Sequence, residues 1–331
     1  MATLPSISDY TTSIQTEALV KAPQLKGGHP ELYNDRVVKY SGGFCVVFPY
    51  EVSGKKFAVR CWHASVSKAE ERTKIIAEYL SRVKLPYFVG FDYVDDGIAT
   101  KDGLQPIVVM DWVNAKPIKI YIKDHLYESN KLKNLADAFL KMVKDLHKNK
   151  ISHGDLQHGN IMVKDDGSLV LVDYDSMYVP QLAGWSDDIS GLEGYQHPAR
   201  WDNKELTPKA DYFSELVIYS SIKALEKAPA LWNDLKMEDT DTMLFNSEDI
   251  KSGGTTNIFG VLESLPDCKD LSITIKKFLS CQTIGELLPL EDVLVDPIDD
   301  LRAQWQDNGY QAKPAYSHSD VESIAKQWGN R

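Results

Sequence analysis

The stretches "ISHGDLQHGNIMV" (residues 151–163) and "LVLVDYDSM" (residues 169–177) place polar residues at the ends of short apolar runs. Such runs of Ile, Val and Leu predict buried strands, and polar groups at their ends either cap a turn or face a site. A single Asp is as consistent with a turn as with a site, because Asp favours turns. The rest of the chain must therefore decide whether Asp155, Asn160 and Asp173 belong to one site.

Composition narrows the class of protein. The 331 residues suffice for one large domain or for two lobes with separate cores. The net charge of −11 argues against a nucleic-acid groove, because Lys and Arg supply most of that affinity. No apolar run approaches the roughly 20 residues of a membrane helix, and the N-terminus lacks a basic segment followed by an apolar one. We therefore expect a cytoplasmic protein without a nucleic-acid or membrane partner.

The cysteine spacing excludes some metal and disulfide sites, and the net charge limits how a phosphate ligand could be bound. Cys45, Cys61, Cys268 and Cys281 show no C-x-x-C spacing, so neither zinc nor a disulfide framework is expected. Because the chain is acidic, a phosphate ligand would need a local arrangement that includes a divalent cation.

Composition and predicted secondary structure divide the chain into four parts. Residues 1–30 are rich in Ser, Thr and Pro and predict an N-terminal arm with at most a short helix. Residues 31–113 predict strands, a hairpin turn at Ser53-Gly54 and a single long helix within 65–83. Residues 114–295 predict a larger, mainly helical lobe, with amphipathic or apolar helices at 130–149 and 207–225. Residues 296–331 form a polar tail. The predicted class is α+β, with a small antiparallel β lobe and a larger helical lobe.

Residues 36–285 resemble a eukaryotic-type (Hanks-type) serine/threonine protein kinase domain of the kind found in bacteria. The family's catalytic loop, H-x-D-L-x-x-x-x-N, matches His153-Gly154-Asp155-Leu156 through Asn160. The family's D-F-G motif matches Asp173-Tyr174-Asp175, 18 residues after Asp155. The joint match carries the resemblance, whereas any one Asp would not.

The resemblance implies a bilobal kinase fold and transfer of a phosphoryl group from ATP. Asp155 would be the catalytic base that receives or orients the proton of the substrate hydroxyl. Asn160 and Asp173 would be ligands of Mg²⁺ or Mn²⁺, because hard cations prefer carboxylate and amide oxygens. The apolar strands would hold these three side chains rigidly, as positional catalysis requires.

The upstream lobe should supply a cation and an acid. The strand "KFAVRCW" puts Arg60 where the family's V-A-I-K motif has Lys. Glu78, in the middle of the predicted helix, is the expected partner, because Glu70 and Glu71 lie near the helix start. The competing interpretation of Glu78 is an exposed helix charge. Arg for Lys is not a neutral exchange, since guanidinium is a planar fork and ammonium a point charge.

The resemblance also implies a nucleotide pocket. Its glycine-rich loop is degenerate, with Gly42 as the matching glycine and Gly43 beside it, and Ser41-Gly42-Gly43 alone would be a hairpin turn. The other implied pocket residues come from the upstream lobe and the connector: Val47 and Ala58 above adenine, Met110 as gatekeeper, and the connector Asp111-Trp112-Val113.

Three departures from the family pattern carry information. Gly154 stands where many members have an Arg that docks a phosphorylated loop, so control by loop phosphorylation is not expected. Gln157 replaces a Lys near the transferring phosphate. Asp175 replaces the glycine of D-F-G and is either a second metal acid or a turn residue with positive φ.

Three functions remain open from the sequence. The segment "GLEGYQHPAR" (residues 191–200) keeps Tyr195 and Pro198 of the family's substrate-docking segment, which favours a protein substrate over a small molecule of the aminoglycoside or choline type. Asp211 matches the family's helix Asp that braces the catalytic loop, and it also suits a helix N-terminus. A pseudokinase is suggested by Arg60, Gln157 and the degenerate loop. The tail could dock on the helical lobe, link to a further domain or bind a partner.

Overall fold

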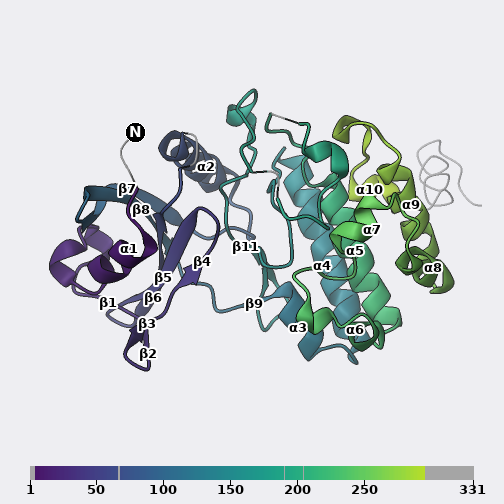
Figure 1. The fold of residues 1–331 in the computed structure, drawn as a ribbon, viewed down its shortest axis with the longest axis horizontal. Helices are drawn as coiled ribbons and strands as arrows, with labels where there is room; N and C mark the ends of the chain where they lie inside the picture. The colour runs from purple at the N-terminus through teal and green to yellow at the C-terminus, as the bar shows by residue number, and fades with distance from the viewer. Residues whose placement is uncertain (1–3, 66–67, 190, 204, 295–331) are drawn as a thin grey trace, which may run out of the picture. The chain divides into compact units, whose positions relative to one another are not determined.

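The computed structural model describes residues 4–65, 68–189, 191–203 and 205–294. One unit ends at Leu290, and within it a β-rich lobe is followed by a mainly helical lobe (Figure 1). The predicted bilobal α+β fold is thereby confirmed. None of the helices in the described ranges is both long enough and apolar enough to cross a bilayer. The predicted tail, residues 296–331, lies outside the described residues, and the domain boundaries stay a prediction.

An antiparallel sheet forms the frame of the smaller lobe. Its strands run in the order β1-β5-β6-β8-β7, and β4 also pairs with β5. The hairpin between β5 and β6 turns at Ser53 (φ +51°) and Gly54 (φ +82°). Positive φ at both central residues is the signature of a type I′ turn, so the predicted hairpin turn is confirmed. The strands are β1 (His29–Pro30), β4 (Tyr40–Ser41), β5 (Cys45–Val52), β6 (Lys55–Trp62), β7 (Phe91–Thr100) and β8 (Gly103–Asp111), with β2 (Leu32–Tyr33) and β3 (Arg36–Val37) in a separate hairpin.

The residues before β1 cover one face of this sheet. Alternate residues of β5, Val46 and Phe48, point to this face, as the period of a strand requires. Tyr10 and Ile14 of α1 (Ile7–Ile14) and Leu25 complete the same buried core. The segment that the sequence assigned to an arm therefore contributes to the core of the lobe. Two short 3₁₀ helices, η1 (Glu17–Leu19) and η2 (Pro23–Leu25), connect α1 to β1.

Helix α2 (Ala69–Val83) is the single long helix predicted for this lobe. Its buried residues are Arg72, Ile76 and Leu80, which recur every four positions and so lie on one stripe of the helix. Ala69 packs against the sheet face that carries Cys45 and Trp62, the face opposite α1. The phase of α2 therefore decides which of its side chains can reach the space between the lobes.

The larger lobe is organised around two helices and one small sheet. Helix α4 (Ser129–Lys148) packs its apolar stripe against α5 (Tyr212–Lys227). The short strands β9 (Lys116–Pro117), β10 (Ile161–Val163) and β11 (Leu169–Leu171) form an antiparallel sheet at the side nearer the small lobe (Figure 1). The remaining elements are α3 (Ile118–Asp124), η3 (Pro180–Leu182), η4 (Pro198–Arg200), α6 (Leu231–Asp234), η5 (Met237–Asp239), α7 (Ser247–Lys251), α8 (Asn257–Ser264), α9 (Lys269–Leu279), η6 (Ile284–Glu286) and α10 (Leu290–Val293).

Candidate active site

The loop between α4 and β10 brings Asp155 and Asn160 together. Asn160 Nδ2 donates to the main-chain oxygen of Asp155 at 2.8 Å and to Oδ2 of the same residue at 3.1 Å. The amide nitrogen is thus occupied, which leaves the amide oxygen of Asn160 for the cavity that this residue lines. The other Asp155 oxygen, Oδ1, accepts the N–H of Leu192 at 3.2 Å. Both carboxylate oxygens are therefore fixed in direction by the chain itself.

Asp211 braces this loop from below. The N–H groups of His153 and Gly154 both donate to its carboxylate, the second at 2.9 Å. Asp211 is also the N-cap residue of α5, so both interpretations of this residue hold. His153 Nε2 donates to the carbonyl of Val172 at 2.9 Å, which ties the catalytic loop to the residue just before Asp173.

The Asp173-Tyr174-Asp175 motif follows β11 and is anchored by its central side chain. Tyr174 is buried, and its hydroxyl donates to the carbonyl of Leu171 at 2.8 Å and accepts the N–H of Val89 at 3.1 Å. Asp173 has φ +67°, a conformation that Asp tolerates better than most residues. The result is a turn that presents the Asp173 carboxylate to the cleft.

A cavity of about 470 Å³ lies between the two lobes, within the range of ~300–1,000 Å³ that is usual for small-molecule sites. It carries the side chains predicted to surround adenine and the metal: Val47, Ala58, Arg60, Met110, Asp111, Val113, Asn160 and Asp173. A smaller adjoining hollow of about 150 Å³ shares Arg60 and Asp173 with the cavity and adds Gly42, Gly43 and Asp155. All predicted site residues except Glu78 therefore line one or both of these two neighbouring hollows.

The turn that contains Gly42 and Gly43 has free space around both glycines. Gly42 N–H donates to the carbonyl of Cys45 at 2.9 Å, which closes the turn between β4 and β5. A Cβ added at Gly43 would meet nothing within 4 Å, and one added at Gly42 would meet only the Cys45 carbonyl, at 3.9 Å. The two glycines thus leave open space beside the smaller hollow that they line, and their contact with phosphate stays a prediction.

Arg60 does not pair with Glu78. In the part of the chain that the structure describes, the carboxylates that contact Arg60 belong to Asp173, at 2.9 Å, and Asp175. Glu78 is exposed on α2, whose buried stripe passes through Arg72 and Ile76 instead. The alternative interpretation of Glu78, an exposed helix charge, fits this placement. The pairing predicted from the spacing between Arg60 and Glu78 is thus corrected.

Burial and ionic partners set the protonation of these groups. Burial is the main cause that raises the pKa of Asp155 to about 6, and the neighbouring Asp173 adds to the rise. For Arg60, burial opposes the charged form, but Asp175 and Asp173 outweigh it and raise the pKa further. Arg60 is therefore a permanent cation in the cleft. Asp155 is more basic than an ordinary aspartate, which favours acceptance of a proton.

The comparison with protein families decides the identity of the fold. A model described as the protein kinase domain matches residues 41–282, well over half of the chain. The chain belongs to the protein kinase domain family. The match begins at the turn before β5 and ends after α9, so it includes both lobes of the kinase domain and every predicted site residue. A search of curated proteins found none that matches the sequence. Family membership supports a phosphotransferase.

The kinase domain departs from its family's pattern at Gly154 and Gln157 for local reasons. Gly154 has φ +78°, and a Cβ there would lie 2.1 Å from the carbonyl oxygen of Ser176. Only glycine fits such a close approach between two backbone segments. Gln157 Oε1 accepts the N–H of Gly159 at 2.6 Å, so this side chain folds back on its own loop. Neither position places a cation next to Asp155.

The segment 191–200, predicted to dock a substrate, contacts the loop that carries Asp155 and Asn160. Tyr195 is buried, and its hydroxyl accepts the N–H of Met243 at 2.9 Å and donates to Nδ1 of His158 at 2.8 Å. Burial lowers the pKa of His158 to about 4, which keeps this ring neutral and able to accept that bond. The segment predicted from Tyr195 and Pro198 is therefore attached to the loop between Asp155 and Asn160 through His158.

Sequence reasoning missed several residues that shape the site. Asp175 is not the turn residue with positive φ, because that residue is Asp173. The Asp175 carboxylate accepts from Arg60, and a role as a second metal acid stays a prediction. Arg72 is a second such residue, and its signal in the sequence is a lone Arg on the apolar stripe of a helix. Three further apolar residues line the cavity: Val89, Met162 and Val172. Val172 directly precedes Asp173, and Met162 lies two residues after Asn160.

Proposed function

We propose that this kinase domain is an ATP-dependent phosphotransferase that phosphorylates serine or threonine hydroxyls of proteins. The observation that carries the proposal is that Arg60 and Asp173 line both the cavity that Asn160 lines and the adjoining hollow that Asp155 lines. They come from three separate segments: Arg60 from β6, Asp155 and Asn160 from the loop before β10, and Asp173 from the loop after β11. Groups of these types are the ones that phosphoryl transfer requires.

The residues divide the work between binding and chemistry. Val47 and Ala58 would lie above adenine, Met110 would stand behind it, and the connector Asp111 to Val113 would lie along its edge. Arg60 would contact the phosphates. Asn160 and Asp173 would hold Mg²⁺ or Mn²⁺, because their oxygens face the cavity and suit a hard cation. In the described ranges no cluster of three or more His, Cys, Asp or Glu side chains could hold a metal alone, so nucleotide phosphates would share in binding it.

The reaction follows from the orientation of Asp155. Its carboxylate would accept the proton of the substrate hydroxyl while that oxygen bonds to the γ-phosphorus. The bond from this phosphorus to the β–γ bridging oxygen breaks, and ADP leaves. A bound Mg²⁺ would neutralise charge on the phosphate oxygens during the transfer. Leu192 and Asn160 keep the carboxylate aimed through the bonds described above.

Incubation with radiolabelled ATP and Mg²⁺ or Mn²⁺ tests the proposal. We expect label on the protein itself or on a general acceptor protein, on serine or threonine, and its loss in Asp155→Ala and Asp173→Ala. Arg60→Lys should change turnover markedly, since the two cations differ in reach and shape. Labelling of aminoglycosides or sugars but not of protein would favour a small-molecule kinase instead.

A second function remains supported by Arg60, Gln157 and the degenerate glycine turn. A pseudokinase would bind nucleotide and act through a partner, without transferring phosphate. Nucleotide-dependent thermal stabilisation of a chain that transfers no label to any acceptor would favour it. At a ligand concentration of 100 times Kd, binding should stabilise the fold by about 2.7 kcal/mol.

A further inference from the structure

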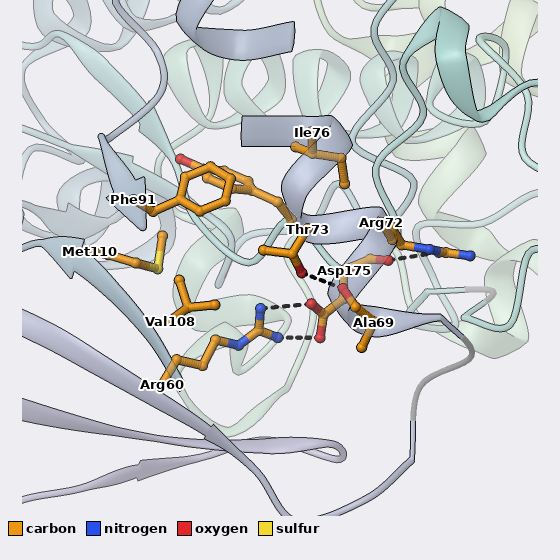
Figure 2. A pocket seen from close by; sticks show the side chains of 10 residues that line it. Arg60, Ala69, Arg72, Thr73, Ile76, Phe91, Val108, Met110 and Asp175 are labelled. Atoms are coloured by element: carbon orange, nitrogen blue, oxygen red, sulfur yellow. Dashed lines mark hydrogen bonds and ion pairs between the residues drawn. The ribbon is translucent and has the colours of Figure 1, made fainter. Parts of the chain in front are cut away.

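The wall of the cleft around Arg60 contains no acid from α2. The α2 residues that line a small cavity of about 20 Å³ beside Arg60 are Ala69, Arg72, Thr73 and Ile76 (Figure 2). The acid comes instead from the loop after β11 that carries Asp173 and Asp175, residues 172–176, which we call the metal loop after its proposed role. Arg60 Nη1 donates to Oδ1 of Asp175 at 2.7 Å, and Nη2 donates to Oδ2 of the same carboxylate. Such a two-point contact fixes the plane and the direction of a guanidinium group.

Arg72 connects α2 to the same loop. It is 2% exposed, and its Nη1 donates to the main-chain oxygen of Asp175 at 2.8 Å (Figure 2). Its Nη2 donates to the carbonyl of Ser186 at 2.7 Å. One guanidinium on α2 therefore holds two points of the segment that follows Asp173. These contacts are specific to a fork-shaped side chain, because an ammonium group cannot reach both carbonyls in the same way.

We propose that Asp175 is a positioning residue that holds Arg60 in place of a helix glutamate, and that Arg72 links Asp175 to α2. The inference rests on the proposed function. The connection between the strand cation and α2 then runs through the metal loop: the Asp175 carboxylate binds β6, and its main-chain oxygen binds α2. The charge on the helix is reversed relative to the arrangement predicted from the sequence. Displacement of α2 would therefore move the metal loop and the Ser186 segment together.

An ordinary buried ion pair would contribute only to folding. The contact between Arg60 and Asp175 should also affect turnover, because Arg60 Nη2 contacts Asp173, the proposed metal ligand, at 2.9 Å. Without the Asp175 carboxylate, Arg60 would retain Asp173 as its acidic partner in the described chain and would shift toward the cation site. Misplacement of a phosphate-binding group by about 1 Å can reduce turnover by about 100-fold.

The same chemical change at three carboxylates tests this assignment. In Asp175→Asn we expect kcat to fall by about 100-fold, while Asp175→Glu recovers part of it because the charge remains. Glu71→Gln, an exposed position on α2, is the matched control and should behave as wild type. Loss of turnover in Glu78→Gln but not in Asp175→Asn would overturn the proposal in favour of a helix glutamate.

Arg72→Lys tests the second half of the link without changing charge. We expect faster amide hydrogen exchange at Asp175 and around Ser186, together with a lower kcat. Unchanged exchange and unchanged turnover in this variant would contradict the role assigned to Arg72.

A double-mutant cycle does not depend on catalysis or on any one variant being fully stable. Thermal unfolding of Asp175→Asn, Arg60→Met and the double variant should show that the cost of Asp175→Asn largely disappears once Arg60 is neutral. A turn residue would show the same cost in both backgrounds, which would refute the pairing. If the wild type transfers no phosphate, the proposed function fails, but the cycle and the exchange measurement still decide the link.

Discussion

At the scale of single residues, the backbone at Gly154 shows how closely the catalytic loop and the metal loop approach each other. The Ser176 carbonyl occupies the position that a Cβ on residue 154 would need. The same carbonyl approach excludes the arginine that many family members carry at this point. Residue 154 therefore cannot contribute a side chain to regulation, whatever its neighbours provide.

Gly154→Ala should destabilise the protein, because it combines a strained positive φ with a backbone clash. Strain of this kind alone costs about 1–3 kcal/mol, and displacement of Ser176 adds to it. Gly260→Ala is the matched control: Gly260 lies inside α8 with open space around it, so alanine should stabilise by about 1 kcal/mol. Urea unfolding measures both, and equal shifts for the two variants would contradict the argument.

Residue spacing predicted part of the site well and part poorly. Asn160 lies directly before β10 and Asp173 lies two residues after β11, and the pairing of these strands brings both residues to the same edge. Asp155, in the loop before β10, is joined to them by its hydrogen bonds with Asn160. Glu78 was placed by its distance from Arg60, but the phase of α2 depends on the connection before it. That phase puts Arg72 and Ile76 inward and leaves Glu78 outside. Distance along a sequence does not determine helix phase.

At the scale of elements, the N-terminal helix is the main addition to the fold expected from the sequence. Residues 1–30 look like an arm because Ser, Thr and Pro predominate. Nevertheless Tyr10 and Ile14, four positions apart, are both buried against the sheet. The signal was present, but only two large side chains carry it, and their partners lie on strands more than thirty residues away. Tertiary packing rather than local propensity fixes this helix.

Substitutions in α1 should therefore affect the stability of the lobe. Ile14→Ala should cost about 2–5 kcal/mol, as for other buried aliphatic side chains. Tyr10→Phe removes a hydrogen bond of 3.0 Å to the carbonyl of Trp62 and should cost about 1 kcal/mol. Thr12→Ala, on the exposed side of the same helix, should stay within about 0.5 kcal/mol. If Ile14→Ala matched Thr12→Ala in chemical denaturation, α1 would be a dispensable arm after all.

At the scale of the whole molecule, the two lobes could be predicted from the sequence, but the contacts that join them could not. Tyr79 of α2 donates to the carbonyl of Asn149 at 2.7 Å, and Tyr87 donates to Asp145 of α4 at 2.7 Å. These partners are separated by roughly sixty residues or more, and no local pattern marks them. Polar contacts of this kind depend on how the lobes close, which periodicity does not report.

A buried ion pair lies next to the loop that contains Gly154. Arg200 and Asp187 approach to 2.7 Å with both side chains wholly buried, and Arg200 Nη2 also donates to the carbonyl of Gly154 at 3.2 Å. Asp187 lies next to Ser186, which Arg72 holds from the other side. Asp187 therefore supplies the ionic partner that the buried Arg200 requires beside the Gly154 carbonyl.

Because the chain itself supplies the ionic partner of Arg200, we expect the segment around Asp187 and Arg200 to be ordered without phosphorylation. Protein treated with a phosphatase should retain its phosphotransfer rate, measured with radiolabelled ATP after the phosphatase is removed. Asp187→Asn should cost about 3–5 kcal/mol in thermal unfolding, because Arg200 would remain buried without an ionic partner. Asp188→Asn, the exposed neighbour, should change stability by less than about 0.5 kcal/mol. A phosphatase-sensitive rate would show that phosphorylation supplies the ordering charge. Equal effects of the two substitutions would show that the Asp187–Arg200 pair does not stabilise this segment.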